Sequence, residues 1–389
     1  MPSTHLKNML YRVALPFLAP SCCGQLTHQQ SGHPLTSLDG YERILCRHHV
    51  FGASLLLSQG NQIAACLTST EKPLHTASES TMFRVASITK MATALVTLRC
   101  IDEKQFALDT PAADLLEDGA AFSTLQGVTV RHILSHTSGL RDPACLETSL
   151  HAQHPWTELL ADSSIRAAEP GQQMIYSNLS FGLLGSILET TTGMCLEKLF
   201  QTKLFQPLHM RATLDATTLP LEDLMPIVRI LPYHPENELR ASPLGNHPLT
   251  SPDPLYHYGY TAGALYTDAQ SVMQMLQLIH HRGVLDGHQF ISEGLMNEMT
   301  TRQASTSTRT YGLGLVILNR PEISERPLLG HQGFAYGCVD GAFIEEQTGR
   351  AVVFLNGGAS EARDGRLALV NRDLLIWAMK QELPAWKKS

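Results

Sequence analysis

Two Ser-x-x-Lys segments in the sequence have the residue types that an activated serine needs. A serine hydroxyl becomes a nucleophile when a base takes its proton, and a lysine three residues later on a helix faces the same side. Lys72, which follows Ser69, precedes Pro73, and a residue before proline disfavours helical geometry. Ser87 and Lys90 lie where a short extended run enters a helical pattern, beside free backbone N–H groups. We therefore expect Ser87 to be the nucleophile, with a plain helix cap as the alternative.

A single Tyr-x-Asn pattern, at Tyr176 and Asn178, could complete this proton-transfer group. It follows a Pro-Gly turn and directly precedes an apolar helical stripe that begins at Leu179. A phenol has a pKa of about 10 in water, and nearby cations favour its phenolate, so a tyrosine beside Lys90 could move protons. Asn178 could hold Lys90, bind a substrate amide or simply cap the helix. The pattern leaves open whether Lys90 or Tyr176 is the main base.

A third pattern, His-x-Gly, occurs three times, and its context selects one copy. The copy at His281 ends an amphipathic segment and resembles a helix C-cap, while His257 lies in an irregular, proline-rich stretch. His331 and Gly333 lead directly into an apolar run expected to form a strand over 334–345, where glycine lets a substrate approach the backbone. We therefore choose His331.

In this order, the three patterns resemble the signatures of the class C β-lactamase and penicillin-recognising serine hydrolase family, with its esterases, D-aminopeptidases and DD-peptidases. Other recurring stretches of that family are matched at 83–90, 131–140, 262–267 and 311–314. The resemblance covers roughly residues 40 to 380 and is therefore specific. It implies an α/β fold, with an antiparallel sheet flanked by helices, an inserted mostly helical domain and an active site between them.

The resemblance also implies roles for individual residues. Ser87 would attack a carbonyl, and backbone N–H groups of Ser87 and Phe334 would stabilise the tetrahedral intermediate. Lys90 and Tyr176 would accept the serine proton and pass it to the leaving group. Tyr176 would then activate the water or other nucleophile that releases the acyl group. The substrate would be held by these residues: Asn178, His331, Gln332, Gly333 and Phe334.

The third pattern departs from that of many relatives, and this departure bears on the substrate. β-Lactamases of this kind carry Lys-Thr-Gly there, whose cation and hydroxyl bind the substrate carboxylate. Here His331 is mostly neutral near pH 7, and Gln332 has no hydroxyl. A β-lactamase or DD-carboxypeptidase is therefore less favoured than a hydrolase of esters, small amides or peptides with D-residues. An acyltransferase or peptide cyclase of secondary metabolism would use the same acyl-enzyme, and an inactive binding or sensor protein is the least favoured class.

Periodicity predicts the elements that position these residues. Alternating and apolar runs favour strands, and apolar residues at spacings of three and four favour helices. The strands are expected at 50–58, 61–68, 311–318, 334–345 and 351–356. The helices are expected from 88 onward, over 179–188, from a Thr267–Gln270 capping box towards Gly283, and over 367–383. Residues 215–258 hold eight of the 21 prolines and are expected to be irregular, either as a wall of the substrate cleft or as a tolerated insertion.

These elements predict one catalytic unit with two parts. Residues 1–35 are expected to be a leader or disordered N-terminus, and residues 36–389 a single unit. Within it, 36–86 and 262–389 would form the α/β part and 87–261 the helical part. If the weak leader is a signal, the protein would be periplasmic or secreted; otherwise it would be cytoplasmic.

Composition excludes several partners. A formal charge of −7 with no basic run disfavours nucleic acid, and no apolar stretch is long enough to cross a bilayer. The eight cysteines lack zinc-ligand spacing, and the resemblance implies no metal, so we attribute the His132 and His136 pair to packing. We expect no cofactor, and a small ester, amide or short peptide as the partner.

Overall fold

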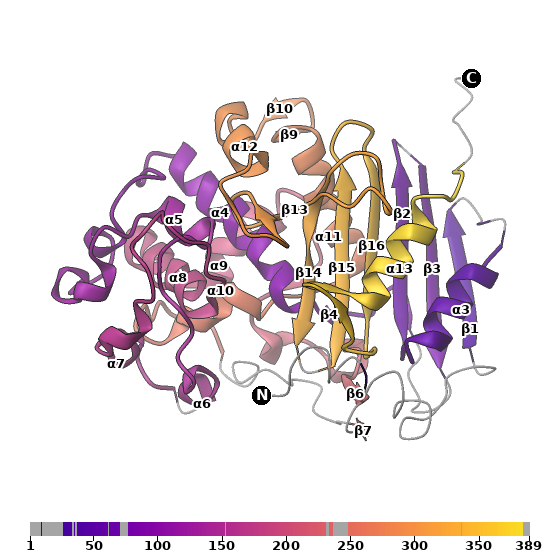
Figure 1. Cartoon of the computed structure of the whole chain (residues 1–389), viewed down its shortest axis with the longest axis horizontal. Coiled ribbons are helices and arrows are strands. Elements are labelled where there is room, and N and C mark those ends of the chain that lie inside the picture. Colours follow the sequence, from indigo (N-terminus) through magenta and orange to yellow (C-terminus); the bar gives the residue numbers. More distant parts are fainter. Residues whose placement is uncertain are drawn as a thin grey trace.

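One antiparallel sheet is assembled from both ends of the chain (Figure 1). The computed structural model describes residues 9, 26–32, 35, 37–60, 62–70, 77–151, 153–230, 233–235, 248–335 and 337–383. Nine strands of this described part pair in the order β1-β3-β2-β16-β15-β14-β13-β12-β11. Their bounds are β1 Leu26–Gly32, β2 Ala53–Gln59, β3 Gln62–Thr70, β11 Ala304–Ser305, β12 Thr310–Tyr311, β13 Val316–Leu318, β14 Leu328–Ala335, β15 Cys338–Glu345 and β16 Arg350–Asn356. The predicted antiparallel sheet is thereby confirmed.

The sheet begins before the predicted boundary at residue 36. Strand β1 pairs with β3 along its whole length, from Leu26 opposite Thr70 to Gly32 opposite Ala64. Residues 26–32 therefore belong to the sheet and not to a leader. The remainder of the predicted leader, with Cys22 and Cys23, lies outside the described residues except for residues 9 and 35.

Two predicted strands are each divided by a turn. The run 311–318 forms β12 and β13, because the chain turns between them at Gly314, whose φ is +68°. The run 334–345 is the end of one strand and the whole of the next, β14 and β15, joined by a tight turn with Gly337 at φ +105°. His331 therefore lies inside β14, not ahead of a strand. Glycine tolerates both positive φ values without steric cost.

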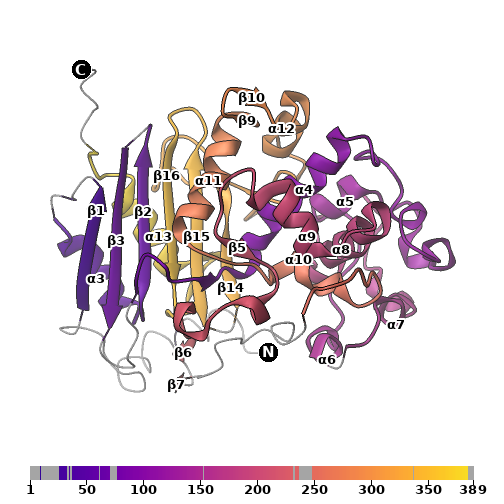
Figure 2. The same ribbon diagram turned by 180° about the vertical axis from the view of Figure 1, so that it is seen from behind.

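Helices cover both faces of the sheet (Figures 1 and 2). Helices α3 (Asp39–Arg47) and α13 (Leu369–Ala378) pack on one face, and α11 (Ala269–His280) packs on the other. Each face has its own buried apolar cluster, so both faces of the central strands are desolvated. Helix α13 ends before the predicted residue 383.

The predicted capping box of α11 is wrong. The N-cap is Asp268, whose carboxylate accepts a hydrogen bond from Ser271 N at 2.7 Å. Thr267 is instead paired in strand β8 (Tyr266–Thr267), and its hydroxyl donates to the backbone oxygen of Arg211. Aspartate caps as well as threonine does, so the prediction missed the position by one residue.

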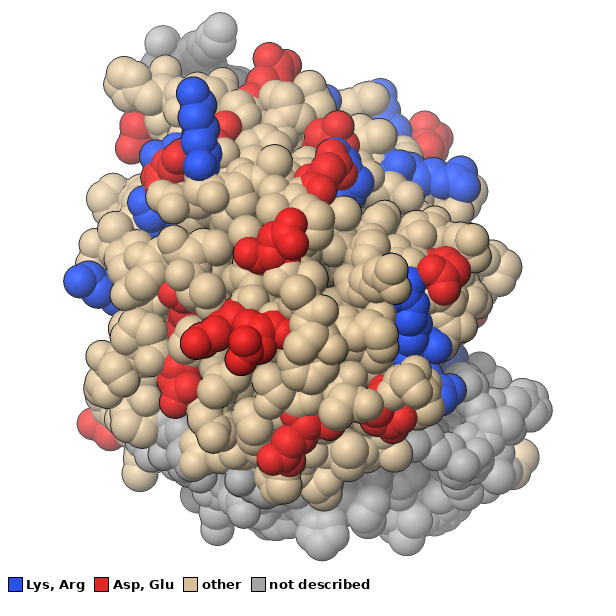
Figure 3. All heavy atoms as spheres, turned by 90° about the vertical axis from the view of Figure 1, so that its left-hand side faces the viewer, with Lys and Arg blue, Asp and Glu red and all other residues tan. Residues whose placement is uncertain are grey.

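Most of the remaining helices gather beyond the β11–β14 side of the sheet (Figure 1). They are α4 Thr89–Asp102, α5 Val130–Leu134, α6 Leu146–His151, α7 Trp156–Leu160, α8 Asn178–Thr192, α9 Leu196–Phe200 and α10 Tyr260–Gly263, with α12 Glu293–Thr300 nearby. We propose that residues 87–261 form the helical part of the single catalytic unit. On the face at this end, carboxylates are spread among uncharged residues and no continuous basic patch is visible (Figure 3).

Short elements join the two parts. Strand β8 pairs with β4 (Phe83–Arg84) and β5 (Ala212–Thr213). The described portion of the predicted irregular segment 215–258 contains short 3₁₀ turns and the small hairpin of β6 (Val228–Ile230) and β7 (Tyr233–Pro235). Further two-residue strands are β9 Val284–Leu285, β10 His288–Gln289, β17 Arg363–Asp364 and β18 Leu367–Ala368. No single helix in the described ranges is long and apolar enough to span a membrane, and α8 with the segment Leu196–Phe205 meets that test only as a pair bent by 84°.

Candidate active site

Ser87 is the one accessible point in an otherwise buried stretch of chain. It lies in a 3₁₀ turn, Ala86–Ile88, that runs directly into α4, and it is the only residue between 81 and 98 that is not buried. The residue before it, Ala86, has φ +43°, a conformation that non-glycine residues rarely adopt. Such strain is typical of functional sites, where the surrounding structure enforces it.

Lys90 lies beneath Ser87, one helical turn away, and is fully buried. Its Nζ is 2.6 Å from the carbonyl oxygen of Ala262, 2.9 Å from Asn178 Oδ1 and 3.2 Å from Ser87 Oγ. Burial lowers the pKa of Lys90 to about 7, although the charge of Asp142 opposes this shift. A substantial share of Lys90 is therefore neutral near pH 7 and able to accept a proton.

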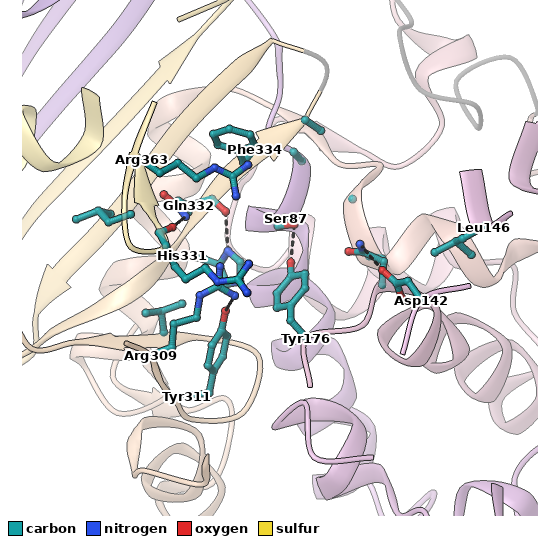
Figure 4. Close-up of a pocket in the computed structure, with 18 of the residues that line it drawn as sticks. Ser87, Asp142, Leu146, Tyr176, Arg309, Tyr311, His331, Gln332, Phe334 and Arg363 are labelled. Atoms are coloured by element: carbon teal, nitrogen blue, oxygen red, sulfur yellow. Dashed lines mark hydrogen bonds between the residues drawn. The ribbon is translucent and has the colours of Figure 1, made fainter. Parts of the chain in front are cut away.

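Tyr176 approaches Ser87 from the other side. Its hydroxyl donates to Ser87 Oγ at 2.8 Å, and its ring lies 5.0 Å from Lys90 Nζ (Figure 4). Burial raises the pKa of Tyr176 to about 12, despite the hydrogen bond to Ser87. The phenol is therefore protonated near neutral pH. The three residues predicted to act together are thus brought into mutual contact.

Asn178 is held by a residue that the sequence patterns did not indicate, Asp142. Asp142 Oδ2 accepts from Asn178 Nδ2 at 2.9 Å, and its Oδ1 accepts from Leu179 N at 2.9 Å and from Ser177 Oγ at 2.8 Å. Ser177 is the N-cap of α8, and its Oγ accepts a hydrogen bond at the start of that helix. A carboxylate at a helix N-terminus is electrostatically favoured. Asp142 thereby ties the start of α8 to the loop that follows α5.

His331 lies within β14 and is 3% exposed. Its Nδ1 donates to the carbonyl oxygen of Gln332 at 2.7 Å, while Nε2 has no hydrogen-bond partner among the described residues. Burial lowers the pKa of His331 to about 3, and the nearby charge of Lys90 adds to this effect. The imidazole is therefore neutral near pH 7, as the sequence predicted.

The other third-motif residues have different surroundings. Gln332 lines the cleft, but its amide donates to the carbonyl oxygen of Arg366 and accepts from Ala368 N at 3.1 Å. We therefore propose that Gln332 holds the segment 366–368 in position, in place of the predicted contact with substrate. A Cβ on Gly333 would lie 2.4 Å from the backbone oxygen of Val85, so glycine alone lets β14 approach the segment before Ser87 so closely.

One cleft of about 670 Å³ lies between the sheet and the helices, and its lining includes Ser87, Tyr176, Asn178 and His331 (Figure 4). The wall on the helical side includes the apolar residues Leu146 and Leu150 and the acidic residues Asp142 and Glu147. The wall on the β14 side carries arginines, namely Arg309, Arg320, Arg363 and Arg366. The cleft therefore has an apolar and acidic wall opposite a cationic one.

The arginines also went unrecognised in the sequence. The Arg309 guanidinium lies 5.4 Å from the ring centroid of Tyr176 and donates to Tyr311 OH at 3.2 Å, and Arg363 lies 3.4 Å above the ring of Phe334. In the described part of the chain, Arg309 forms no ion pair with a carboxylate, whereas Arg320 pairs with acidic neighbours. No short motif surrounds these arginines, so only the fold reveals their proximity to the site.

The two histidines of the i, i+4 pair have separate surroundings. His132 Nδ1 accepts from Thr129 N at the start of α5, and the ring of His136 packs 4.3 Å from that of Tyr176. His136 is fully buried, and burial lowers its pKa well below the ordinary value. Within the described ranges, no group of three or more histidine, cysteine or acidic side chains could hold a metal ion.

Comparison with known families agrees with this geometry. A family model described as Beta-lactamase matches residues 29–375, which is most of the chain. The chain belongs to the Beta-lactamase family. The family that was predicted from the three motifs and their order is thereby confirmed.

Named proteins with similar sequences have different activities. The D-alanyl-D-alanine-carboxypeptidase/endopeptidase AmpH of Escherichia coli strain K12 is 27% identical over 228 residues, which is 54% of this chain and 58% of AmpH. Esterase EstB of Burkholderia gladioli is 26% identical over 337 residues, 76% of this chain and 82% of EstB. The match to AmpH therefore spans little more than half of that relative's length.

Several solved structures share the fold. The D-amino acid amidase from Ochrobactrum anthropi SV3, in complex with L-phenylalanine, has a TM-score of 0.66 and 21% identity over 85% of this chain and 94% of the amidase. EstCE1, a hydrolase with promiscuous acyltransferase activity, has a TM-score of 0.65 and 22% identity over 84% of this chain and 94% of its own. The predicted fold class is confirmed by these likenesses.

Proposed function

We propose that this protein is a serine hydrolase that forms an acyl-enzyme on Ser87. One observation carries the proposal: Ser87 Oγ opens into the cleft while lying within hydrogen-bonding distance of both Lys90 Nζ and Tyr176 OH. A nucleophile within reach of a base that is itself oriented by further groups is the arrangement that acyl transfer requires.

The opposed pKa shifts support one proton path. Neutral Lys90 takes the proton of Ser87 as the serine oxygen bonds to the substrate carbonyl carbon. When the tetrahedral intermediate collapses, the bond to the leaving group breaks and the leaving group takes a proton from Tyr176. Tyr176 then recovers a proton from the Lys90 ammonium. Lys90 is therefore the main base in acylation, because Tyr176, with its pKa of about 12, is protonated near pH 7.

The developing oxyanion would be stabilised by the backbone N–H groups of Ser87 and Phe334. The close approach of β14 to the segment before Ser87 supports this assignment, because it brings the residue after Gly333 to the same end of the cleft. In deacylation, Tyr176 would direct water, or another nucleophile, at the acyl-enzyme, a role supported by its hydrogen bond to Ser87 Oγ.

We propose esters and small amides, including peptides with D-residues, as substrates. The cleft wall around Leu146 and Leu150 suits an apolar acyl group, and Glu147 nearby suits an amine. The names of the similar proteins, an esterase and a D-amino acid amidase among them, support the same substrates. If the open cleft also admits an alcohol or amine acceptor, the acyl group is transferred to it and the protein acts as an acyltransferase or peptide cyclase.

Kinetics on a substrate panel test this function. p-Nitrophenyl esters, D-aminoacyl amides and a penicillin would be compared in wild type and Ser87→Ala, with and without an added amine acceptor. We expect turnover of esters or D-aminoacyl amides that disappears in Ser87→Ala. Turnover that is unchanged in Ser87→Ala, or none with any substrate, would contradict the proposal.

A second candidate is favoured by the cationic wall. The sequence disfavoured substrates with a carboxylate because the third motif lacks a cation, but Arg309 supplies one beside Tyr176. Since the leaving group must reach Tyr176, a carboxylate on that group would lie near Arg309. A DD-carboxypeptidase or β-lactamase activity is therefore the second candidate.

A matched pair of substrates separates the two candidates. 4-Nitrophenyl hexanoate and 3-carboxy-4-nitrophenyl hexanoate differ only in a carboxylate on the leaving group. If the second candidate holds, Arg309→Gln lowers kcat/KM about 10- to 100-fold for the anionic ester alone, because a charged hydrogen bond is lost. An equal effect on both esters would reject a carboxylate subsite at Arg309.

A further inference from the structure

The strongest constraint on Lys90 comes from the acceptors that surround its amine. Of its three close neighbours, the carbonyl oxygen of Ala262 and Asn178 Oδ1 can only accept hydrogen bonds. A neutral amine has two N–H groups and one lone pair. When both N–H groups point at these two oxygens, the remaining direction is towards Ser87 Oγ, where the lone pair can receive the serine proton.

This arrangement depends on which way the amide of Asn178 is turned. If the amide were reversed, Nδ2 would face Lys90 and could donate to the lone pair that Ser87 needs. Asp142 prevents this, because its Oδ2 accepts from Asn178 Nδ2 at 2.9 Å and a carboxylate cannot donate to the amide oxygen. Asp142 is itself fixed by two further donors, Ser177 Oγ and Leu179 N.

We propose that Asp142 is a positioning residue that holds the amide oxygen of Asn178 towards Lys90 and thereby aims the Lys90 lone pair at Ser87. The inference rests on the proposed function and adds a residue that none of the three motifs contains. Asp142 touches neither Ser87 Oγ nor Lys90 Nζ in the hydrogen bonds of the site; it acts through Asn178.

Asp142 also affects the charge of Lys90. The groups that surround the amine from other elements are largely neutral near pH 7: the pKa of Tyr176 is raised, and those of His136 and His331 are lowered. The positive charge of Arg309 further lowers the pKa of both histidines. The carboxylate of Asp142 raises the pKa of Lys90 against the effect of burial, so its removal should shift that pKa further down.

The test is Asp142→Asn, which keeps the shape of the side chain but removes the charge and one acceptor. The amide of Asn178 is then free to reverse, and we expect kcat to fall about 100-fold while KM changes little. The acid limb of kcat/KM against pH should also move to lower pH, by about one unit. The shift of this limb reports the charge lost beside Lys90, and the fall in kcat reports the lost orientation of the Asn178 amide.

Ser177→Ala is the matched control. It removes one hydrogen bond to Asp142 and the N-cap of α8 but leaves the Asp142–Asn178 contact, so it should lower thermal stability without moving the acid limb. The double variant Asp142→Asn/Asn178→Asp keeps a hydrogen bond between the two positions and places the carboxylate beside Lys90. Its acid limb should move to higher pH than in wild type, the opposite of the single variant.

The outcomes separate two failures. If a fluorophosphonate forms no adduct at Ser87 of the wild type, the proposed function fails, and this inference fails with it. If the wild type is labelled but Asp142→Asn keeps the same kcat and the same acid limb, only the role of Asp142 is overturned. The role is also overturned if Ser177→Ala moves the acid limb as far as Asp142→Asn does.

Discussion

At the scale of single residues, two proton carriers with opposite pKa shifts meet at Ser87. Burial lowers the pKa of Lys90 to about 7 and raises that of Tyr176 to about 12, so near neutral pH one can accept a proton and the other can donate one. Pairs whose environments move their pKa values in opposite directions divide the acid and base roles. Burial thus leaves Lys90 able to accept the serine proton and Tyr176 able to donate a proton to the leaving group.

Tyr176→Phe should therefore affect substrates according to their leaving groups. An alkoxide or amine needs the proton of Tyr176, so we expect kcat on such substrates to fall by about 100-fold or more. A p-nitrophenolate leaves without protonation, so acylation by a p-nitrophenyl ester should persist while the acyl-enzyme accumulates. Stopped-flow release of nitrophenol with intact-mass spectrometry measures both. Equal losses in acylation for both kinds of substrate would contradict this role.

The sequence located the residues that lie in local motifs, and missed those that only the fold brings near. Ser87 and Lys90 are one helical turn apart, so spacing predicted their contact. The approach of Tyr176 and Asn178 to this pair was implied by the resemblance of the three motifs to a known family, because these residues are far apart in the sequence. Asp142 and Arg309 lie in loops without a local pattern. The hydrogen bonds of Asp142 to the start of α8 and the approach of Arg309 to the ring of Tyr176 could not be inferred from periodicity.

At the scale of elements, the site depends on how closely β14 packs against the turn that carries Ser87. Gly333 provides this approach, because any side chain there would meet the backbone oxygen of Val85. The sequence assigned Gly333 to the site but placed it before a strand. A continuous apolar run hid the turn between β14 and β15, since both strands are buried and neither alternates clearly.

Gly333→Ala should separate the two elements. A Cβ at 2.4 Å from the Val85 oxygen must displace β14, so we expect about a 100-fold loss of kcat and a stability loss of about 1–3 kcal/mol. Gly294→Ala in α12 is the control, because its Cβ would meet nothing within 4 Å and activity should be unchanged. Ester kinetics and urea unfolding measure these effects. Full activity in Gly333→Ala would show that the close approach is not needed.

At the scale of the whole molecule, a sheet built from both chain ends surrounds the base of the cleft with buried side chains. Apolar clusters on both faces desolvate the central strands, and α4 is buried on nearly all sides between the sheet and the other helices. The sequence predicted one buried apolar face for α4, whereas tertiary packing buries most of its residues. The same packing keeps His331 and His136 uncharged.

Stability should therefore depend on pH through His331. Its pKa is about 3 when folded and about 6.5 as the ordinary value, so the unfolded chain binds the proton more readily. The contribution of His331 to the free energy of unfolding is fully present above pH 6.5 and falls as pH decreases towards 3. His136 acts in the same direction, and Asp340, whose pKa is raised, acts in the opposite one.

Urea unfolding at pH 7 and pH 5 of wild type and His331→Gln isolates this contribution. Wild type should lose about 2 kcal/mol more than the variant over this interval, since the variant has no imidazole to protonate. A loss of equal size in both proteins would mean that His331 does not titrate in this window.

Active-site labelling is the sharpest test of an acyl-enzyme on a Ser87 that Lys90 activates. Wild type and Ser87→Ala would be incubated with a fluorophosphonate over a range of pH, and the adduct located by intact-mass and peptide mass spectrometry. We expect one adduct, on Ser87, that is absent from Ser87→Ala and forms at a rate that rises as pH increases through about 7. No adduct in wild type, or an adduct that persists in Ser87→Ala, would contradict this expectation.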